Sequence, residues 1–401
     1  MIPYGKHFLD QDDIDAVVDV LKNGALTQGP KVAEFERSIA KYTGAKFAVA
    51  VSSGTAALHL SCLVSGVNFG DKVVTSANTF VASANCALYV GAEPQVVDID
   101  QATLNIDLNL LEKACEQHSS IGAIIPVHFA GSPCDMEYIR RIANKNKAFL
   151  IEDASHALGA RYDNGHKVGN CEFSDLTVFS FHPVKGIASG EGGMITTNNS
   201  YLYKKLLLLR SHGICKGNFD LPGIGDNSDD ELVNKKEGIE NNELKLWYYE
   251  MQMLGYNYRI TDIQAALAIS QMKKIDMFLE RRRDIVSRYD KAFKFCQNIQ
   301  PTQIRSRDFS SHHLYVIRVK FKNIRLTRNQ FMLKLREKGI GTQVHYIPIP
   351  MQPYYEAMGL SIGDYPVSKA IYEELLSIPI YYELTDEMQD FVISAILTLA
   401  E

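Results

Sequence analysis

The sequence predicts an α/β protein whose central sheet is mostly parallel. Short apolar runs rich in Val, Ile and Phe alternate with segments of helical character along the first two-thirds of the chain. This alternation is typical of a parallel sheet with helices on both of its faces. A predicted helix over residues 79–89, with Gly91 as its stop, is one such intervening segment. We expect strands at residues 47–51, 73–75, 95–97, 123–127, 149–151 and 177–181.

The rest of the chain predicts a second, smaller domain. We place an N-terminal arm and the large domain at residues 1–245, and a smaller C-terminal α+β domain at residues 246–401. Near their junction, a polar and glycine-bearing insertion includes Asp220 to Glu231, and it is either a tolerated surface loop or a functional lid. In the smaller domain we expect one long helical pattern at 263–283, a strand at 314–321 and a helix at 328–338.

The bulk composition is that of a globular enzyme. The chain has 401 residues, of which 46% are hydrophobic and 22% charged, and its formal net charge is −5. This charge gives no reason to expect nucleic acid or an anionic membrane as a partner. Seven dispersed cysteines without a CxxC pair favour reduced thiols in a cytoplasmic compartment, and we expect no metal site. The N-terminus lacks a signal pattern, and no apolar run is long enough to span a bilayer.

Lys185 is the residue that most directly indicates a catalytic function. It follows a short apolar run, in a polar turn that continues into glycines. A lysine at the mouth of a buried strand can form a Schiff base, because partial desolvation lowers its pKa and frees the amine as a nucleophile. Earlier in the chain, another apolar run ends in Asp153. A lysine for the aldehyde and an aspartate for the ring nitrogen are the two anchors that pyridoxal phosphate needs.

Further residues could complete such a site, although each also has an ordinary structural explanation. The turn Ser53-Gly-Thr-Ala56 could bind a phosphate at a helix start, or could simply cap that helix. Ser180 could add a hydroxyl to the same phosphate, or could pack within the sheet. His156 could bond the phenolic oxygen of the ring, and Phe80 could stack on the ring face, although most such residues are structural.

Seven motifs together give the chain a specific resemblance. It is similar to the sugar-nucleotide aminotransferases of the DegT/DnrJ/EryC1/StrS type, which have the aspartate-aminotransferase fold of fold type I pyridoxal-phosphate enzymes. The resemblance extends over nearly the whole chain. The motifs are Leu26-Thr-Gln-Gly-Pro30, Ser53-Gly-Thr-Ala56, Glu152-Asp-Ala-Ser-His-Ala-Leu-Gly-Ala160, Phe179-Ser-Phe-His-Pro-Val-Lys185, Gly190-Glu-Gly-Gly193, Arg210-Ser-His-Gly213 and Gly255-Tyr-Asn-Tyr-Arg-Ile-Thr-Asp262.

The resemblance implies a role for each matching residue. Lys185 matches the Schiff-base lysine that also moves a proton during transamination, and Asp153 matches the partner of the ring nitrogen. Asn257 matches an asparagine that reaches the phosphate of the neighbouring subunit, which implies a homodimer with shared active sites. The remaining matches are His156 at a position often occupied by glutamine, Thr55, Ala56 and Ser180 at phosphate contacts, and Phe80 at the stacking aromatic.

Within the family, the chain most resembles the aminotransferases of pseudaminic-acid biosynthesis, which serves surface glycans. Supporting marks are Ile2-Pro-Tyr-Gly5, His312-His-Leu-Tyr315 and Gln343-Val-His-Tyr-Ile-Pro348. The implied reaction uses L-glutamate to aminate C4 of a UDP-linked 2-acetamido-2,6-dideoxy-β-L-arabino-hexos-4-ulose, and gives UDP-4-amino-4,6-dideoxy-N-acetyl-β-L-altrosamine. The candidate substrate contacts are Tyr4, His313, His345 and Tyr346, for which packing between the small domain and the sheet edge is the alternative.

Three other functions stay open at this point. One is amination of a different 4-keto sugar nucleotide, such as the UDP D-xylo epimer, a GDP-perosamine precursor or a dTDP-sugar. Another is a sugar C3-dehydratase, which resembles this chain but has histidine in place of the lysine. A non-catalytic regulatory protein is the third, and it predicts loss of Lys185 or Asp153. Both residues are intact.

Overall fold

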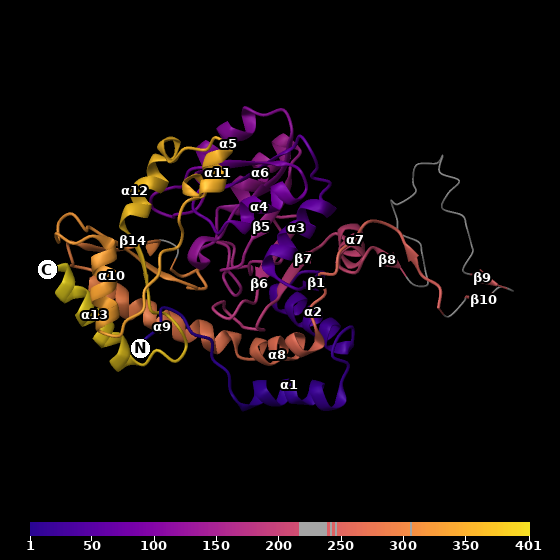
Figure 1. Cartoon of the computed structure of the whole chain (residues 1–401), viewed down its shortest axis with the longest axis horizontal. Helices are drawn as coiled ribbons and strands as arrows, with labels where there is room; N and C mark the ends of the chain where they lie inside the picture. The colour runs from indigo at the N-terminus through magenta and orange to yellow at the C-terminus, as the bar shows by residue number, and fades with distance from the viewer. Residues whose placement is uncertain (216–238, 241–242, 245–246, 305–306) are drawn as a thin grey trace.

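The computed structural model describes most of the chain, drawn in Figure 1 from the N-terminus to the C-terminus. The insertion from Asp220 to Glu231 lies outside the described residues, which are 1–215, 239–240, 243–244, 247–304 and 307–401. Within these residues, no helix has the length and apolar character needed to cross a membrane.

The described part of the large domain is built on a seven-stranded sheet. Its order is β1-β7-β6-β5-β4-β2-β3, and the neighbours β2–β3, β2–β4, β4–β5 and β5–β6 are parallel. Only β7 runs against its neighbours β1 and β6, so the predicted mostly parallel sheet is confirmed. The strands are β1 (Phe47–Val51), β2 (Lys72–Ser76), β3 (Glu93–Val97), β4 (Ile121–Ile125), β5 (Phe149–Asp153), β6 (Leu176–Ser180) and β7 (Gly193–Thr197).

Helices cover both faces of this sheet (Figure 1). One apolar core joins the sheet to α3 (Gly54–Val64), α4 (Ala82–Tyr89) and α7 (Ser200–Arg210). The core on the opposite face contains residues of α2 (Pro30–Thr43), α5 (Leu108–Glu116), α6 (Met136–Asn146) and α8 (Asp262–Met272). The N-terminal helix α1 (Gln11–Asn23) packs outside this layer, against α8. Two short antiparallel pairs join β8 (Ile214–Cys215) to β11 (Glu250–Met251) and β9 (Ile239–Glu240) to β10 (Glu243–Leu244).

The C-terminal part forms a second core around a small antiparallel sheet. In the described residues this sheet has the order β12-β13-β14. The predicted strand at 314–321 corresponds to β13, and the predicted helix at 328–338 corresponds to α10. The division between residues 245 and 246 stays a prediction. The elements of this part are α9 (Ile275–Phe293), β12 (Ile299–Pro301), β13 (Tyr315–Val319), α10 (Arg328–Glu337), α11 (Pro353–Ala357), α12 (Pro366–Glu374), β14 (Leu375–Ile378) and α13 (Asp386–Ala400).

The single long helical pattern predicted at residues 263–283 is wrong, because α8 ends at Met272 and α9 begins at Ile275. At the break, the Lys274 ammonium pairs with Asp10 and with the buried Asp13 at the start of α1. This lysine therefore serves as an anchor for the N-terminal helix. Apolar periodicity does not reveal the break, since the residues on both of its sides continue to face the same core.

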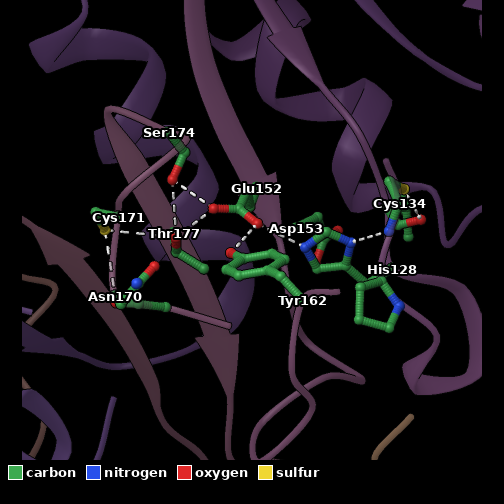
Figure 2. Close-up of polar contacts among 12 residues, drawn as sticks. His128, Cys134, Glu152, Asp153, Tyr162, Asn170, Cys171, Ser174 and Thr177 are labelled. Atoms are coloured by element: carbon green, nitrogen blue, oxygen red, sulfur yellow. Dashed lines mark hydrogen bonds and ion pairs between the residues drawn. The ribbon is translucent and has the colours of Figure 1, made fainter. Parts of the chain in front are cut away.

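A fully buried carboxylate, Glu152, fastens the end of β5 to its surroundings (Figure 2). It accepts hydrogen bonds from His128 Nε2 (2.7 Å), Tyr162 Oη (2.6 Å) and Thr177 Oγ1 (2.9 Å), and one more from Ser174 Oγ. Burial alone would raise the pKa of Glu152, but the bonds from His128, Ser174 and Tyr162 outweigh it and the pKa ends below its ordinary value. The side chain is thus a satisfied anion inside the fold.

Replacing Glu152 with alanine should destabilise the protein strongly. The change leaves the buried donors of His128, Tyr162 and Thr177 without an acceptor, and breaking such a network costs about 3–5 kcal/mol. Thermal unfolding should show a large drop in Tm for Glu152→Ala and a smaller one for Glu152→Gln. As a matched control, Glu172→Ala removes a carboxylate whose side chain is 40% exposed beside His166, and Tm should barely move. Equal shifts in the two alanine variants would contradict this account of Glu152.

Candidate active site

A cavity of about 400 Å³ opens at the edge where the parallel strands end. The ends of β5 and β6 and the turn that follows β1 contribute to it, as expected for a ligand site beyond the carboxyl ends of such strands. Segments from opposite ends of the chain close it, since Tyr4 and residues 345–346 also form its wall. The predicted site residues that line it are Tyr4, Thr55, Phe80, Asp153, His156, Ser180, Lys185, His345 and Tyr346.

Lys185 lies in the turn after β6, which its own backbone helps to close. Its N–H donates to the carbonyl oxygen of His182 at 2.8 Å. Burial lowers the pKa of Lys185 from its ordinary value of 10.5 to about 8, and the negative charge of Asp153 opposes that shift. The amine is therefore far more available as a nucleophile than an exposed lysine would be.

Asp153 is the last residue of β5 and is only 6% exposed. One of its oxygens, Oδ2, accepts a hydrogen bond of 2.6 Å from the hydroxyl of Ser83, and the other, Oδ1, accepts one of 3.1 Å from the N–H of Ser155. The carboxylate is thus held in place while it still lines the cavity. It can accept a further hydrogen bond from a cationic N–H there, because each carboxylate oxygen has more than one lone pair.

The start of α3 forms a cradle suited to a phosphate. Ser53 caps the helix by accepting a hydrogen bond of 3.0 Å from the N–H of Ala56. The N–H groups of Gly54 and Thr55 belong to the first turn, where a helix provides no partner of its own for them. A Cβ on Gly54 would lie 2.9 Å from that of Ser180, so glycine is needed here for the close approach of the two segments. Both Thr55 and Ser180 line the cavity, whereas the buried Ala56 lies behind it.

Two hydrogen bonds decide which nitrogen of His156 carries the proton. The N–H of Ala130 donates to Nδ1 at 3.3 Å, so Nδ1 must be the unprotonated acceptor. Burial and, after it, the charge of Lys185 lower the pKa of His156 well below its ordinary value, so the ring is neutral. The proton is therefore on Nε2, which lies 2.9 Å from the hydroxyl of Tyr346 and can donate to it. His156 thus offers the cavity an N–H donor.

The outer wall of the cavity consists of aromatic and polar side chains. Phe80 is 55% exposed, and its ring centroid lies 5.9 Å from that of Tyr346. The rings of Tyr4 and His345 are 5.5 Å apart. The Nδ1 atom of His345 bonds the Ser377 hydroxyl at 2.9 Å, and burial, with the charge of Lys185, lowers the pKa of His345 to about 4. This wall thus has neutral hydrogen-bonding groups beside an exposed apolar face.

Besides Ala56, two of the predicted site residues lie outside the cavity in this chain. His313 is buried behind His156, with the ring centroids 4.4 Å apart, so its contact is with a site residue and not with the cavity itself. Asn257 is exposed and pairs through its backbone with Ser211. An exposed asparagine in this position is available to a second subunit, which is the role that the resemblance implies.

Sequence reasoning did not assign a role to several residues at this site, and Thr79, Ser83 and Glu191 are among them. Thr79 and Glu191 line the cavity, and Ser83 reaches Asp153 from the first turn of α4. The predicted helix at 79–89 starts too early, since α4 begins at Ala82 and leaves Thr79 and Phe80 in the wall. A serine near a helix start resembles an ordinary cap in the sequence, so nothing distinguishes Ser83 before the fold brings α4 against β5.

Comparison with known proteins identifies the family. The model of the DegT/DnrJ/EryC1/StrS aminotransferase family matches residues 8–397. The chain belongs to this family. The family is one of aminotransferases, and in this chain Lys185 and Asp153 line one cavity.

Similar proteins agree with this assignment over the full length of the chain. The UDP-4-amino-4,6-dideoxy-N-acetyl-beta-L-altrosamine transaminase of Campylobacter jejuni strain 81-176 is 38% identical over 100% of this chain and 98% of its own. Helicobacter pylori PseC, an aminotransferase involved in the biosynthesis of pseudoaminic acid, matches with a TM-score of 0.86 and 30% identity over 99% and 98% of the two chains. Spr1654 of Streptococcus pneumoniae, assigned as a sugar aminotransferase and solved in a PLP-form, matches with a TM-score of 0.86 and 31% identity over 100% and 98%.

The reactivity of Lys185 should depend on pH in a way that separates it from the other lysines. Only the neutral amine attacks an aldehyde, so trapping of a small aldehyde at Lys185 should rise through pH about 8 and level off above it. Borohydride reduction followed by peptide mass spectrometry measures this. The Asp153→Asn variant should shift the midpoint to lower pH, because the negative charge that raises the pKa of Lys185 is gone. A midpoint near the ordinary 10.5 would contradict the assigned environment.

Proposed function

We propose that this protein is a pyridoxal-phosphate-dependent aminotransferase that places an amine on C4 of a UDP-linked 4-keto sugar, with L-glutamate as the amino donor. The proposal depends on one observation above all. Lys185, Asp153 and the open first turn of α3 meet in a single cavity. An amine, a carboxylate and a phosphate cradle are the three groups required by pyridoxal phosphate.

The residues of the cavity fit this cofactor. Its phosphate suits the first turn of α3 with Thr55 and the neighbouring Ser180, and its ring nitrogen suits Asp153. The N–H of His156 is a donor for the phenolic oxygen of the ring, and Phe80 offers an aromatic face. When bound, the cofactor supplies an electron sink for the carbon from which a proton is removed.

Lys185 is the group that moves the proton. With a pKa of about 8 it can take up and release a proton near neutral pH, which is the condition for efficient general acid–base catalysis. Lys185 is the one amine in the described wall of the cavity, and burial keeps the nearby rings of His156 and His345 neutral. Because Lys185 and Asp153 are both present, the site argues against a C3-dehydratase and against a regulatory protein.

Neutral donors and acceptors on the outer wall favour a sugar as the substrate. Burial raises the pKa of Tyr346, so its hydroxyl stays protonated and can donate to a substrate oxygen. Tyr4 and His345 lie beside it, and the bond from Ser377 fixes the orientation of the His345 ring. Similarity to the altrosamine transaminase of Campylobacter jejuni supports the β-L-arabino sugar of pseudaminic-acid biosynthesis. Amination of another 4-keto sugar nucleotide is the alternative.

We further propose that the active form is a homodimer with shared sites. Asn257 is exposed and outside the cavity of its own chain, in line with a role in the site of the neighbouring subunit. Such a two-fold arrangement would give each dimer two equivalent shared sites.

The preferred acceptor should be the β-L-arabino 4-keto sugar and not its D-xylo C5 epimer. A buried site that hydrogen-bonds several hydroxyls rejects the wrong epimer by leaving polar groups unpaired, at about 1–3 kcal/mol for each group. We expect kcat/KM to favour the β-L-arabino compound by at least roughly tenfold. A panel of 4-keto sugar nucleotides measures this. A preference for the D-xylo compound would refute the substrate proposal and leave the aminotransferase assignment standing.

Mixing two inactive variants should restore activity. A Lys185→Ala protomer retains Asn257, and an Asn257→Ala protomer retains Lys185, so each hybrid dimer regains one complete site of its two. Refolding or exchanging the two variants together, followed by an activity assay, tests this against each variant alone. If Asn257 serves its own subunit, the mixture will be no more active than the sum of its parts.

A further inference from the structure

Ser83, in the first turn of α4, belongs to a chain of hydrogen-bonded hydroxyl groups that ends at Asp153. It is fully buried, and its hydroxyl lies 2.6 Å from Oδ2 of Asp153. The Thr79 hydroxyl lies 2.9 Å from that of Ser83. Thr79 lines the cavity, whereas Ser83 lies behind the cavity wall. Ser83 is therefore placed to act on Asp153 from behind the cavity wall, while Thr79 contacts Ser83 from the wall itself.

The direction of each hydrogen bond in this chain follows from elementary chemistry. A carboxylate can only accept, so the single proton of the Ser83 hydroxyl points to Asp153. Ser83 must then accept from Thr79, whose own proton completes the chain. The bonds run from Thr79 to Ser83 to Asp153, and each one strengthens the next by polarisation.

Two further features hold the carboxylate at this point. Ser83 belongs to the first turn of α4, where the partial positive charge of the helix end favours a nearby anion. On the other oxygen, the N–H of Ser155 donates at 3.1 Å. Each oxygen of Asp153 thus accepts one hydrogen bond from the protein, and the carboxylate still lines the cavity.

We propose that Ser83 is a positioning residue that orients Asp153 toward the ring nitrogen of the cofactor, with Thr79 as the donor that orients Ser83. The inference depends on the proposed function, because it concerns the group that Asp153 would bind. Ser83 acts only through Asp153. It contributes both to cofactor affinity and to turnover, but not to recognition of the sugar.

Ser83→Ala should weaken binding of pyridoxal phosphate roughly tenfold, since one hydrogen bond to a charged group is lost. It should also lower kcat and leave KM for the sugar nearly unchanged. Titration of the cofactor-free protein, followed by fluorescence quenching, gives the Kd.

Ser83→Cys keeps a weak donor, and its Kd for pyridoxal phosphate should fall between those of the wild type and the alanine variant. Thr79→Val keeps the shape of the side chain but removes the first donor, and its effect should be smaller, about twofold to threefold.

The chain offers a matched control in Ser61. This serine is also fully buried, on the neighbouring helix α3, and its hydroxyl has no hydrogen-bond partner among the described residues. Ser61→Ala should leave both Kd and kcat unchanged. If Ser83→Ala behaves like Ser61→Ala, the inference is overturned.

A double-mutant cycle separates positioning from a merely structural role. In an Asp153→Ala background the Ser83 hydroxyl has no carboxylate to hold, so adding Ser83→Ala should change Kd by less than about twofold. The same loss in both backgrounds would overturn the inference. If Ser83→Ala does not fold, Thr79→Val tested in both backgrounds decides by the same criterion. Failure of the wild-type protein to bind pyridoxal phosphate would instead refute the proposed function.

Discussion

The end of β5 is the point on which the rest of the site depends. Two consecutive carboxylates, Glu152 and Asp153, point to opposite faces of the sheet because side chains alternate along a strand. Glu152 is fully buried and satisfied by donors from neighbouring segments, so it anchors the strand on one face (Figure 2). Asp153 lines the cavity on the other face, where α4 supplies the donor of Ser83. A strand end held this firmly presents the second carboxylate in one fixed position.

The same anchor extends to the contact between the two parts of the molecule. The His128 ring binds Glu152, and its backbone N–H donates to the Asp153 carbonyl at 3.1 Å. The loop that follows supplies the N–H that fixes the tautomer of His156. It also meets the C-terminal part at Gly131, which has φ of +97° and where a Cβ would lie 2.2 Å from the Ser311 hydroxyl. The hydrogen bonds of Glu152, the bond that fixes the tautomer of His156 and the close approach of Gly131 to Ser311 thus belong to one connected network.

Electrostatics at the cavity follow from burial more than from charge pairing. Burial lowers the pKa of Lys185, and Asp153 limits that shift, so the amine titrates near the pH at which the enzyme would work. Burial also keeps His156 and His345 neutral. A pKa of about 8 suits a group that must both take up and release a proton during the reaction.

The sequence by itself determined the layered α/β architecture, the family and the principal residues Lys185 and Asp153, because strand patterns and ligand-binding turns are local features. Tertiary structure alone decided which side chains meet. It brings Ser83 into contact with Asp153 and places His313 behind His156. It also sets the break between α8 and α9, where Lys274 pairs with α1. Each of these depends on contacts between segments far apart in the chain. Hydrophobic periodicity states only which face is buried, and it leaves open what that face will touch.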